Sequence, residues 1–294
     1  MAHKGMLYKL RRKMQVLMYD LTSPEFVSKI YFRKVVGYKL NLKKPHTFNE
    51  KIQWLKLYEW PNNELAIKCA DKYGVRDYLK DKHMDKYLNE LLGVWNNADD
   101  INFDKLPKQF ALKCTHGCGY NIIVDDKETL DIEKTRKQLN KWLKEDFGKF
   151  NAEPHYSKMK PKIICEKYLG GNITDYKFYF FNGKFEFMYI ASGFGKGDDE
   201  RITMFDKEGN IAPFRRTDYK IMPDAKLPKH FEEMKKLGVE LAKDFVFVRV
   251  DWFEENNKIY FGELTFTPCG GMMKIEPIEY DEILGEKLII NEKK

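Results

Sequence analysis

The sequence predicts an α+β fold, with a mainly helical N-terminal region followed by two subdomains built on antiparallel strands. Helix caps and helical spacing of apolar residues dominate the first hundred residues, and short apolar runs separated by turn residues follow from Leu106 onward. The dipeptide Asn182-Gly183 joins two such runs, as expected of a hairpin. At 294 residues the chain can bury a sizeable core. We expect a helical region over 1–105, a small subdomain over 106–170 and a large subdomain over 171–294.

The N-terminal region has four predicted helical stretches. Residues 6–19 place apolar residues at helical spacing with cations between them, which is typical of a helix on a membrane surface or of a helix packed on its own protein. We favour the packed helix because the apolar face is small. Ser23-Pro24-Glu25 predicts the start of a second helix, and the capping box Thr47-Phe48-Asn49-Glu50 predicts a third that ends at Pro61. Residues 63–80 are predicted to be helical as well.

A flap is predicted after residue 108. The strand 109–114 ends near Lys113, a loop with Gly117 and Gly119 follows, and a second strand returns over 121–126. Backbone N–H groups of such a loop can fold over phosphates, and Lys113 could reach the same phosphates. An ordinary turn is the commoner reading of two glycines in a loop.

The following segments alternate between helix and strand. A helix is predicted over 129–147, a buried strand over 162–169 that Glu166 interrupts, hairpins over 174–193 and 204–214, and a helix over 228–245. The charged C-terminal segment 276–294 is predicted to end in a short helix.

The stretch 245–271 predicts two strands whose polar residues stand out from an apolar background. Arg249 and Asp251 share one strand face, and Glu263 and Thr265 share one face of the next strand. Val248, Val250 and Trp252 occupy the opposite, core-facing positions.

The register of this hairpin decides whether the polar faces coincide. We predict that Glu254 opposes Lys258 across a three-residue loop, which places Arg249 opposite Glu263 and Asp251 diagonal to it. A two-residue loop would separate the carboxylates onto opposite faces. Carboxylates on apolar strands are costly unless paired or metal-bound. An Arg249–Glu263 ion pair is one explanation, but a shared metal ion also accounts for Asp251.

Composition excludes several classes of function. The net charge of +7 comes from cations spread along the chain, with local excess at residues 4–13 and 29–44, and lacks the clustered stripe of a nucleic-acid binder. No apolar run approaches the roughly 20 residues that span a bilayer. The N-terminus lacks the features of a signal peptide, so we expect a cytoplasmic protein.

The five cysteines form an odd, scattered set that predicts reduced thiols. Cys114 and Cys118 lack the second ligand pair of a zinc site. The nearby His116 makes a cysteine nucleophile conceivable, but the phosphate-loop setting disfavours it.

Taken in order, these segments resemble the ATP-grasp superfamily, and within it the teichuronopeptide-biosynthesis-like branch of bacterial surface-polysaccharide gene clusters. The resemblance covers about residues 48–271. It rests on the order and spacing of FNEKIQWLKLY, ADKYGVRDYL, FALKCTHGCGYN, EPHYSKMKPKIICEKYL, DYKFYFFNGK and VRVDWF…KIYFGELTFTP. It implies an ATP-grasp fold in which two α+β subdomains enclose ATP.

The resemblance also implies roles for individual residues. Lys113 and Lys72 would face the phosphates, beneath a loop containing Gly117 and Gly119. Glu166 would accept from the adenine amino group, although a buried ion pair is the alternative. The backbone of Lys167, Tyr168 and Leu169 would pair with the edge of the adenine ring. Asp175 and Lys177 would reach the ribose or the phosphates.

Asp251 and Glu263 match the carboxylates that hold Mg²⁺, and Arg249 matches an arginine that faces the transferred phosphoryl group. Asn is common in the superfamily where this chain has Thr265. The resemblance therefore places Thr265 in the metal site, where its hydroxyl would coordinate the metal or hold a ligated water and a second metal position would be weaker.

The implied activity is an ATP-dependent carboxylate–amine ligase that works through an acyl phosphate. Its substrates would be an anionic sugar or polysaccharide precursor and an amine-bearing acceptor, with contact to membrane-bound assembly machinery at the inner face of the membrane. We expect the acceptor pocket to involve the basic helical N-terminal region and the segments 153–158 and 192–220, including Arg201, Arg215 and Arg216. A glycosyltransferase and a non-catalytic ATP-binding protein are the alternatives; the chain has no Asp-x-Asp triplet, which counts against the former.

Overall fold

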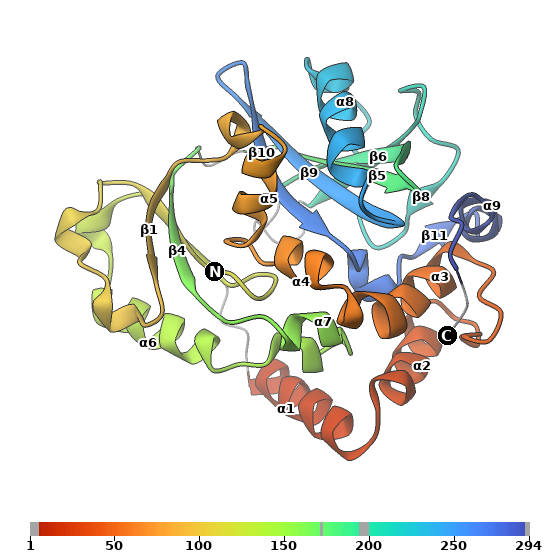
Figure 1. Cartoon of the computed structure of the whole chain (residues 1–294), viewed down its shortest axis with the longest axis horizontal. Helices are drawn as coiled ribbons and strands as arrows, with labels where there is room; N and C mark the ends of the chain where they lie inside the picture. The colour runs from red at the N-terminus through yellow and green to blue at the C-terminus, as the bar shows by residue number, and fades with distance from the viewer. Residues whose placement is uncertain (1–5, 171–172, 194–199, 292–294) are drawn as a thin grey trace.

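Two antiparallel sheets form the framework of the protein (Figure 1). The computed structural model describes residues 6–170, 173–193 and 200–291. The small sheet has the strand order β1-β4-β2-β3, the large sheet has the order β10-β9-β5-β6-β7, and β8 pairs with β11. The strands are β1 (Leu91–Trp95), β2 (Phe110–Cys114), β3 (Asn121–Val124), β4 (Ile163–Lys167), β5 (Asp175–Phe181), β6 (Lys184–Ser192), β7 (Arg201–Asp206), β8 (Arg215–Arg216), β9 (Phe247–Glu255), β10 (Lys258–Thr265) and β11 (Ile275–Glu276).

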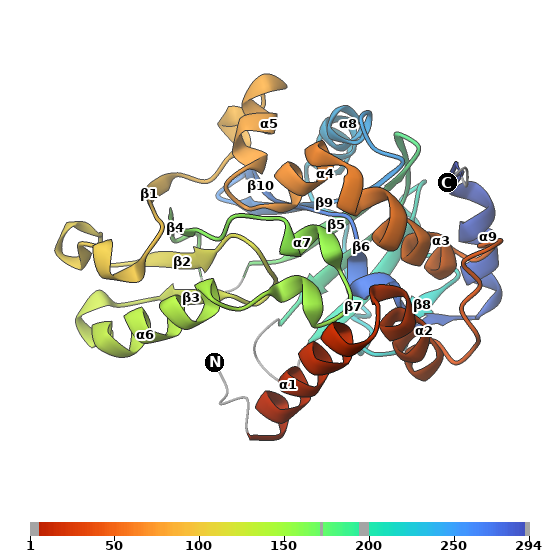
Figure 2. The ribbon, with the colours of Figure 1, turned by 60° about the horizontal axis from the view of Figure 1, so that its bottom comes forward.

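The helices in the described ranges lie around these sheets (Figures 1 and 2). They are α1 (Met6–Leu21), α2 (Pro24–Val35), α3 (Phe48–Trp54), α4 (Glu64–Ala70), α5 (Val75–Asp81), α6 (Ile132–Leu143), α7 (Pro154–Ser157), α8 (Phe231–Ala242) and α9 (Glu279–Lys287). A π-helical turn, Leu55–Glu59, extends α3, and the short 3₁₀ segments include Phe147–Lys149 and Pro268–Gly271. In the part of the chain that the structure describes, no helix has the length and apolar content needed to cross a membrane.

Three predicted element boundaries differ from the structure. Leu91–Trp95 lies in the region predicted to be helical, but it forms β1 and pairs with β4, so the small sheet begins before residue 106. A short apolar run fits either a strand or a buried helix, and here the distant partner strand decides. The helix predicted over 63–80 is two helices, because the Asp71 carboxylate accepts the N–H groups of Tyr73 and Gly74 and turns the chain between them. The helix predicted over 129–147 is regular only over α6.

The large sheet is covered on both faces, and the alternation of side chains along β5 shows how. Phe178 contacts Phe231 of α8 at a ring-centroid distance of 5.8 Å, on one face. Phe181 stacks at 5.4 Å on Phe48 of α3, on the other face. Gly238 of α8 gives the close packing, because a Cβ there would lie 2.2 Å from the Phe180 ring. The candidate polar residues of β5 and β9 share the face with α3 and not the face with α8.

Helices α3 and α9, which are far apart in the sequence, are held together by hydrogen bonds. The capping box predicted at Thr47 and Glu50 is present. The buried Asp281 carboxylate accepts hydrogen bonds from the backbone N–H of Asn49 at 2.9 Å, from its side-chain amide at 2.9 Å and from the Tyr38 hydroxyl at 2.7 Å. These bonds fix α3 against α9.

Candidate nucleotide and metal site

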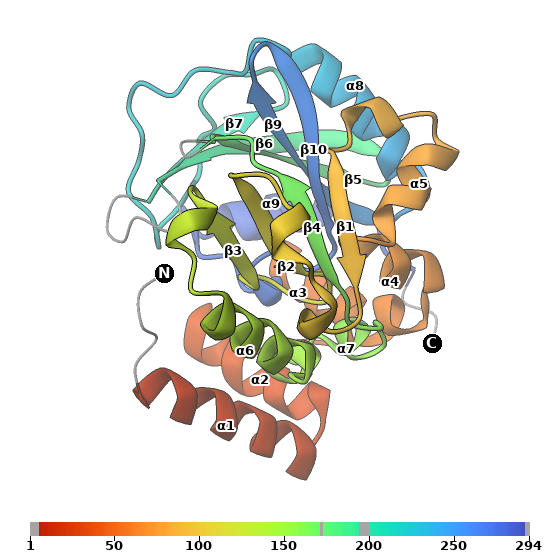
Figure 3. The same cartoon turned by 90° about the vertical axis from the view of Figure 1, so that its left-hand side faces the viewer.

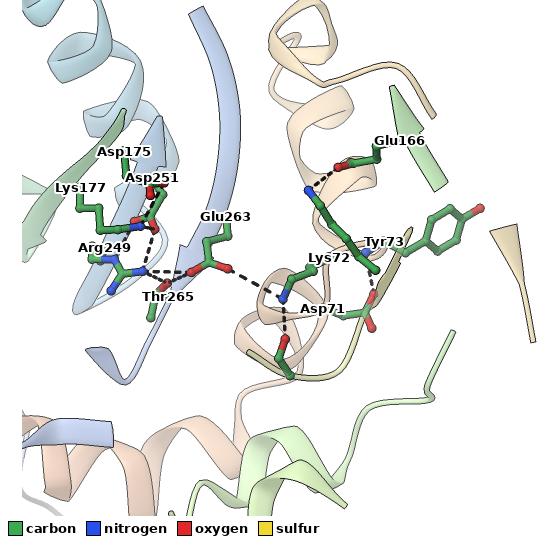
Figure 4. Close-up of polar contacts among 12 residues, drawn as sticks. Asp71, Lys72, Tyr73, Glu166, Asp175, Lys177, Arg249, Asp251, Glu263 and Thr265 are labelled. Carbon is green, nitrogen blue, oxygen red and sulfur yellow. Dashed lines mark hydrogen bonds and ion pairs between the residues drawn. The ribbon is translucent and has the colours of Figure 1, made fainter. Parts of the chain in front are cut away.

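Four polar side chains meet on the β9–β10 hairpin (Figure 4). The Arg249 guanidinium donates to both oxygens of Asp251, at 2.6 and 2.7 Å, to Glu263 Oε1 at 3.0 Å and to Thr265 Oγ1 at 2.8 Å. The Thr265 hydroxyl in turn donates to the same Glu263 oxygen at 2.9 Å. One arginine therefore holds two carboxylates of different strands on one face of the large sheet.

The register that brings these residues together is not the one predicted from sequence. Glu255 pairs with Lys258, so the loop has only two residues, Asn256 and Asn257, both with positive φ. This turn by itself would place the two carboxylates on opposite faces. A bulge between Phe261 and Glu263 adds one residue to β10 and restores the shared face, with Glu263 now opposite Asp251 and Thr265 opposite Arg249.

Gly262 occupies that bulge, and the space around it requires glycine. A Cβ at this position would lie 2.8 Å from the Phe253 ring and 3.0 Å from the backbone oxygen of Asp251. We expect Gly262→Ala to lower the free energy of unfolding by ~1–3 kcal/mol, as overpacking commonly does, and to reduce ATP turnover by displacing Glu263. Lys258→Ala, at an exposed position of the same strand, is the control for urea unfolding and turnover. Equal behaviour of the two variants would show that the bulge tolerates a side chain.

A partly buried lysine, Lys177 of β5, completes the hairpin cluster. Lys177 pairs with Asp251 across the strands, and its ammonium lies 2.5 Å from the Asp251 carboxylate and 3.5 Å from that of Asp175. Burial would lower the pKa of Lys177, but the two carboxylates outweigh this effect and raise it. Burial also raises the pKa of Asp175. Lys177 and Asp175 therefore border the cluster, and Lys177 keeps Asp251 compensated in a position only 1 % exposed.

Lys72 connects the hairpin with the glycine loop. Its ammonium donates to the Gly117 carbonyl at 2.7 Å and lies 3.8 Å from Glu263 Oε2. It projects from the turn between α4 and α5, and so it is not a lysine on the surface of a helix. Burial would raise the pKa of the Glu263 carboxyl, but Lys72 and Arg249 lower it to about 2.

The loop between β2 and β3 is fixed at its base. Gly117 is needed for close packing, since a Cβ there would lie 2.6 Å from the Phe147 ring, and Gly119 has a φ of +74°. His116 Nε2 lies 3.1 Å from the backbone oxygen of Trp142 in α6 and 3.2 Å from that of Glu145. These contacts indicate a structural role for His116. Among the described residues, no group of three or more His, Cys, Asp or Glu side chains is arranged to hold a metal, which includes the Cys114–Cys118 segment.

Lys113 of β2 and Glu166 of β4 lie close together on the small sheet, and Figure 4 shows Glu166. The Glu166 carboxylate accepts from Lys113 at 2.7 Å and from Arg76 at 3.2 Å, and its side chain is 11 % exposed. The ion pair considered as the alternative for Glu166 is thus present. Arg76 was missed by the sequence reasoning; its position four residues after Lys72, in ADKYGVRDYL, was the available signal.

The three residues after Glu166, which form the hinge expected beside the adenine ring, divide into two groups. The backbone of Lys167 is already bonded, because its N–H donates to the Glu90 carbonyl at 3.0 Å and its carbonyl accepts from Asn89 at 2.8 Å. The predicted pairing of the Lys167 backbone with the adenine edge would require those bonds to break. Tyr168 and Leu169 are half-buried and follow directly.

The segment EPHYSK (153–158) was predicted to belong to the acceptor pocket. In the structure it packs against the chain that follows Thr265. Thr267 donates to the buried Glu153 carboxylate. The fully buried Lys56 ammonium donates to the backbone oxygens of Asn151 at 3.1 Å and of Gly270 at 3.2 Å. Burial lowers the pKa of Lys56 to about 8. These buried groups position the chain that follows Thr265.

Two of the three arginines that were predicted to bind an anionic substrate form ion pairs within the protein. Arg215 bonds Glu276 at 2.6 Å, and Arg216 bonds Asp218 at 2.6 and 3.0 Å. Arg201 is exposed on β7, and residues 194–199 of the same predicted segment lie outside the described residues. The predicted pocket therefore does not include free guanidinium groups from Arg215 and Arg216.

The donor chemistry of the hairpin fits Mg²⁺. Glu263 Oε1 is held by Arg249 and Thr265, whereas Oε2 lies on the Lys72 side and the side chain is 35 % exposed. Magnesium in nucleotide sites takes one or two protein carboxylates and completes its shell with phosphate oxygens and water. Glu263 and Asp251 can supply those carboxylates, although Asp251 now has both oxygens bonded by cations.

A family model and several solved structures are similar to this chain. Residues 50–289 match the family model described as TupA-like ATPgrasp. No curated protein matches the sequence. Among solved structures, the D-alanine–D-alanine ligase from Bacillus anthracis in complex with ATP is 16 % identical with a TM-score of 0.44, covering 68 % of this chain and 57 % of that one. The L-amino acid ligase from Bacillus licheniformis is 12 % identical with a TM-score of 0.48, covering 82 % of this chain and 55 % of that one.

The chain spans less than two thirds of the length of either structural neighbour. The family match, in contrast, extends over most of the chain, from within α3 to the last residues after α9. The protein belongs to the TupA-like ATP-grasp family and has the ATP-grasp fold.

Proposed function

We propose that this protein is an ATP- and Mg²⁺-dependent ligase that joins a carboxylate to an amine in the biosynthesis of a bacterial cell-surface polysaccharide. The observation that carries the proposal is the convergence of Lys72, the glycine loop and the Arg249–Asp251–Glu263 cluster between the two sheets. Cations and a metal-binding carboxylate are the groups that phosphoryl transfer requires, because its catalysis consists mainly of positioning and charge neutralisation.

The reaction has two steps. An oxygen of the substrate carboxylate attacks the γ-phosphorus of ATP, the bond to the β-phosphate oxygen breaks, and ADP leaves. The amine then attacks the carbonyl carbon of the acyl phosphate, inorganic phosphate leaves, and the amine gives up a proton as the amide forms. Mg²⁺, when bound, would neutralise phosphate charge at Glu263 and Asp251.

The residues divide the work as follows in this proposal. Lys72 and Lys113 bind phosphate oxygens, which for Lys113 means exchanging part of its contact with Glu166. Arg249 supports the transferred phosphoryl group through its fixed charge and orients both metal-binding carboxylates. Thr265 holds Glu263 in place, since its hydroxyl is already shared between Glu263 and Arg249.

The adenine end of ATP would lie at the hinge formed by residues 166–169. Glu166, held by Arg76 and Lys113, would face the amino group, and the backbone at Tyr168 and Leu169 would face the ring edge. In this proposal Asp175 contacts the ribose, whereas Lys177 pairs with Asp251. We place the reaction in the cytoplasm, where ATP is available.

The activity test is a comparison of products. The protein is incubated with Mg-ATP, uronic-acid-containing sugar precursors and amino-acid amines, and ADP, phosphate and UDP are followed separately. The proposal expects ADP and phosphate to form together only when both substrates are present. Release of UDP from a sugar nucleotide without ATP consumption would identify a glycosyltransferase instead, and ATP binding without turnover under all substrate pairs would identify a non-catalytic binder.

A cleft beside the turn that carries Lys72 is our candidate for the entry of an anionic substrate. It has a volume of about 710 Å³ and lies between α4, the start of α5 and the segment before β4. Its charged lining residues are four lysines and three acids, namely Lys68, Lys158, Lys160 and Lys162, and Glu64, Asp71 and Asp77.

We expect the double variant Lys68→Glu/Lys160→Glu to raise the KM for the acidic substrate at least tenfold and to leave the KM for ATP unchanged. Both side chains are exposed, so the fold should be unaffected. Each like-charge contact opposes binding of an anion. Lys134→Glu, an exposed position on α6, is the matched control for steady-state kinetics. A rise in the KM for ATP instead would show that the cleft serves the nucleotide.

A further inference from the structure

An apolar stripe on α1 and α2 is exposed to solvent. Of the twelve large hydrophobic side chains that are exposed in the described part of the chain, six lie between residues 10 and 30, and they are Leu10, Met14, Leu17, Leu21, Phe26 and Ile30. The four on α1 are 54 to 75 % exposed and recur at intervals of three and four residues. They therefore form one continuous stripe. The other six are isoleucines scattered over residues 123–289.

The stripe is exposed because the opposite side of α1 is the one that packs. Gln15 is buried, the Arg12 guanidinium stacks at 3.6 Å on the Phe150 ring, and Asp20 pairs with Lys149 at 2.6 Å. The sequence analysis favoured a helix whose apolar face packs on its own protein. In the structure these four residues of α1 are exposed instead. Helix α1 itself lies at the margin of the molecule (Figure 3).

Positive charge is concentrated on the same segment. Residues 6–44 contain ten Lys or Arg and two Asp or Glu, a net charge of +8, whereas the whole chain has +7. Arg11 and Lys13 are exposed on α1, where the helical period places them on the two sides of the stripe. Arg33 and Lys34 are exposed on α2, three and four residues beyond Ile30. The two acids are engaged: Asp20 with Lys149, and Glu25 with Lys29 at 2.5 Å.

We propose that the α1–α2 face docks on an anionic membrane surface. Exposed Leu and Met side chains flanked by cations on a helix of low net hydrophobicity are the features of a helix that lies in the interface of a bilayer. Anionic headgroups complement the cations, and the apolar stripe enters the acyl boundary. A symmetric dimer through this face would bring two regions of +8 together, which opposes a second copy as the occupant. The inference does not depend on the ligase reaction.

The test uses the full-length protein and vesicles. Co-sedimentation is measured with phosphatidylcholine vesicles and with vesicles containing about 30 % phosphatidylglycerol, at 150 mM salt. We expect binding to the anionic vesicles only, with a loss of at least tenfold for Leu10→Gln/Met14→Gln/Leu17→Gln and for Arg11→Glu/Lys13→Glu. Each cation near such a surface contributes about 1 kcal/mol, or roughly fivefold. Ile211→Gln/Ile289→Gln removes two exposed apolar side chains elsewhere and should bind like the wild type.

Circular dichroism and ATP turnover in solution should be unchanged in all of these variants, which separates loss of docking from loss of fold and from failure of the proposed reaction. Absence of binding to anionic vesicles would overturn the proposal, as would undiminished binding by the apolar variant. A wild-type dimer in light scattering that the apolar variant converts to a monomer would assign the face to a second copy.

Discussion

Glu263→Gln is expected to lower ATP turnover by ~10²–10³-fold while leaving the fold intact, because it removes the charge of the metal-binding carboxylate. Glutamine keeps an oxygen that Arg249 and Thr265 can bond. The side chain is 35 % exposed, so no buried packing is lost. The measurements are steady-state ADP release and the Mg²⁺ concentration for half-maximal rate, which should rise.

The low pKa of Glu263 sharpens this prediction. With a pKa of about 2, below the ordinary value of 4.5, the carboxylate is ionised throughout an assay range of pH 5–9. Titration of Glu263 therefore does not shape the pH–rate profile there. Its contribution to stability is present above pH 4.5 and is lost as the pH falls toward 2. Glu255→Gln, on the same hairpin beside the turn, is the matched control, and equal turnover in the two variants would remove Glu263 from the metal assignment.

Arg249→Met is expected to destabilise the protein by ~3–5 kcal/mol, because it leaves the buried Asp251 carboxylate with Lys177 as its remaining strong partner in the cluster. This corresponds to a fall in Tm of roughly 10 °C for a domain of this size. Turnover should be lost as well. Arg201→Met, which changes an exposed arginine of the same sheet, should have little effect on the Tm in thermal unfolding and on the free energy of unfolding in urea.

A double variant separates the structural role of Arg249 from its proposed catalytic role. Arg249→Met/Asp251→Asn replaces the carboxylate that has lost its arginine partner by a neutral amide, so most of the lost stability should return. Turnover should not return, because both the fixed positive charge and one metal-binding carboxylate are absent. Recovery of turnover in the double variant would show that Arg249 acts only by compensating Asp251.

The sequence by itself determined much of the fold and the identity of the polar residues. The capping box at Thr47, the Asn182-Gly183 hairpin and the core positions Val248, Val250 and Trp252 are decided by local geometry and by strand alternation, and all are present. The order of motifs led to the ATP-grasp family in the same way. Such features depend on residues close in the chain, so a sequence displays them directly.

Tertiary structure decided what depends on distant partners. β1 is a strand because β4 pairs with it, and Glu166 is enclosed by Lys113 and by Arg76, ninety residues away. The apolar stripe of α1 faces outward because Arg12 and Gln15 pack inward. At the hairpin, the sequence supplied Asp251 and Glu263 but the wrong register. A bulge at Gly262, stabilised by packing that no local pattern reveals, puts both carboxylates on one face.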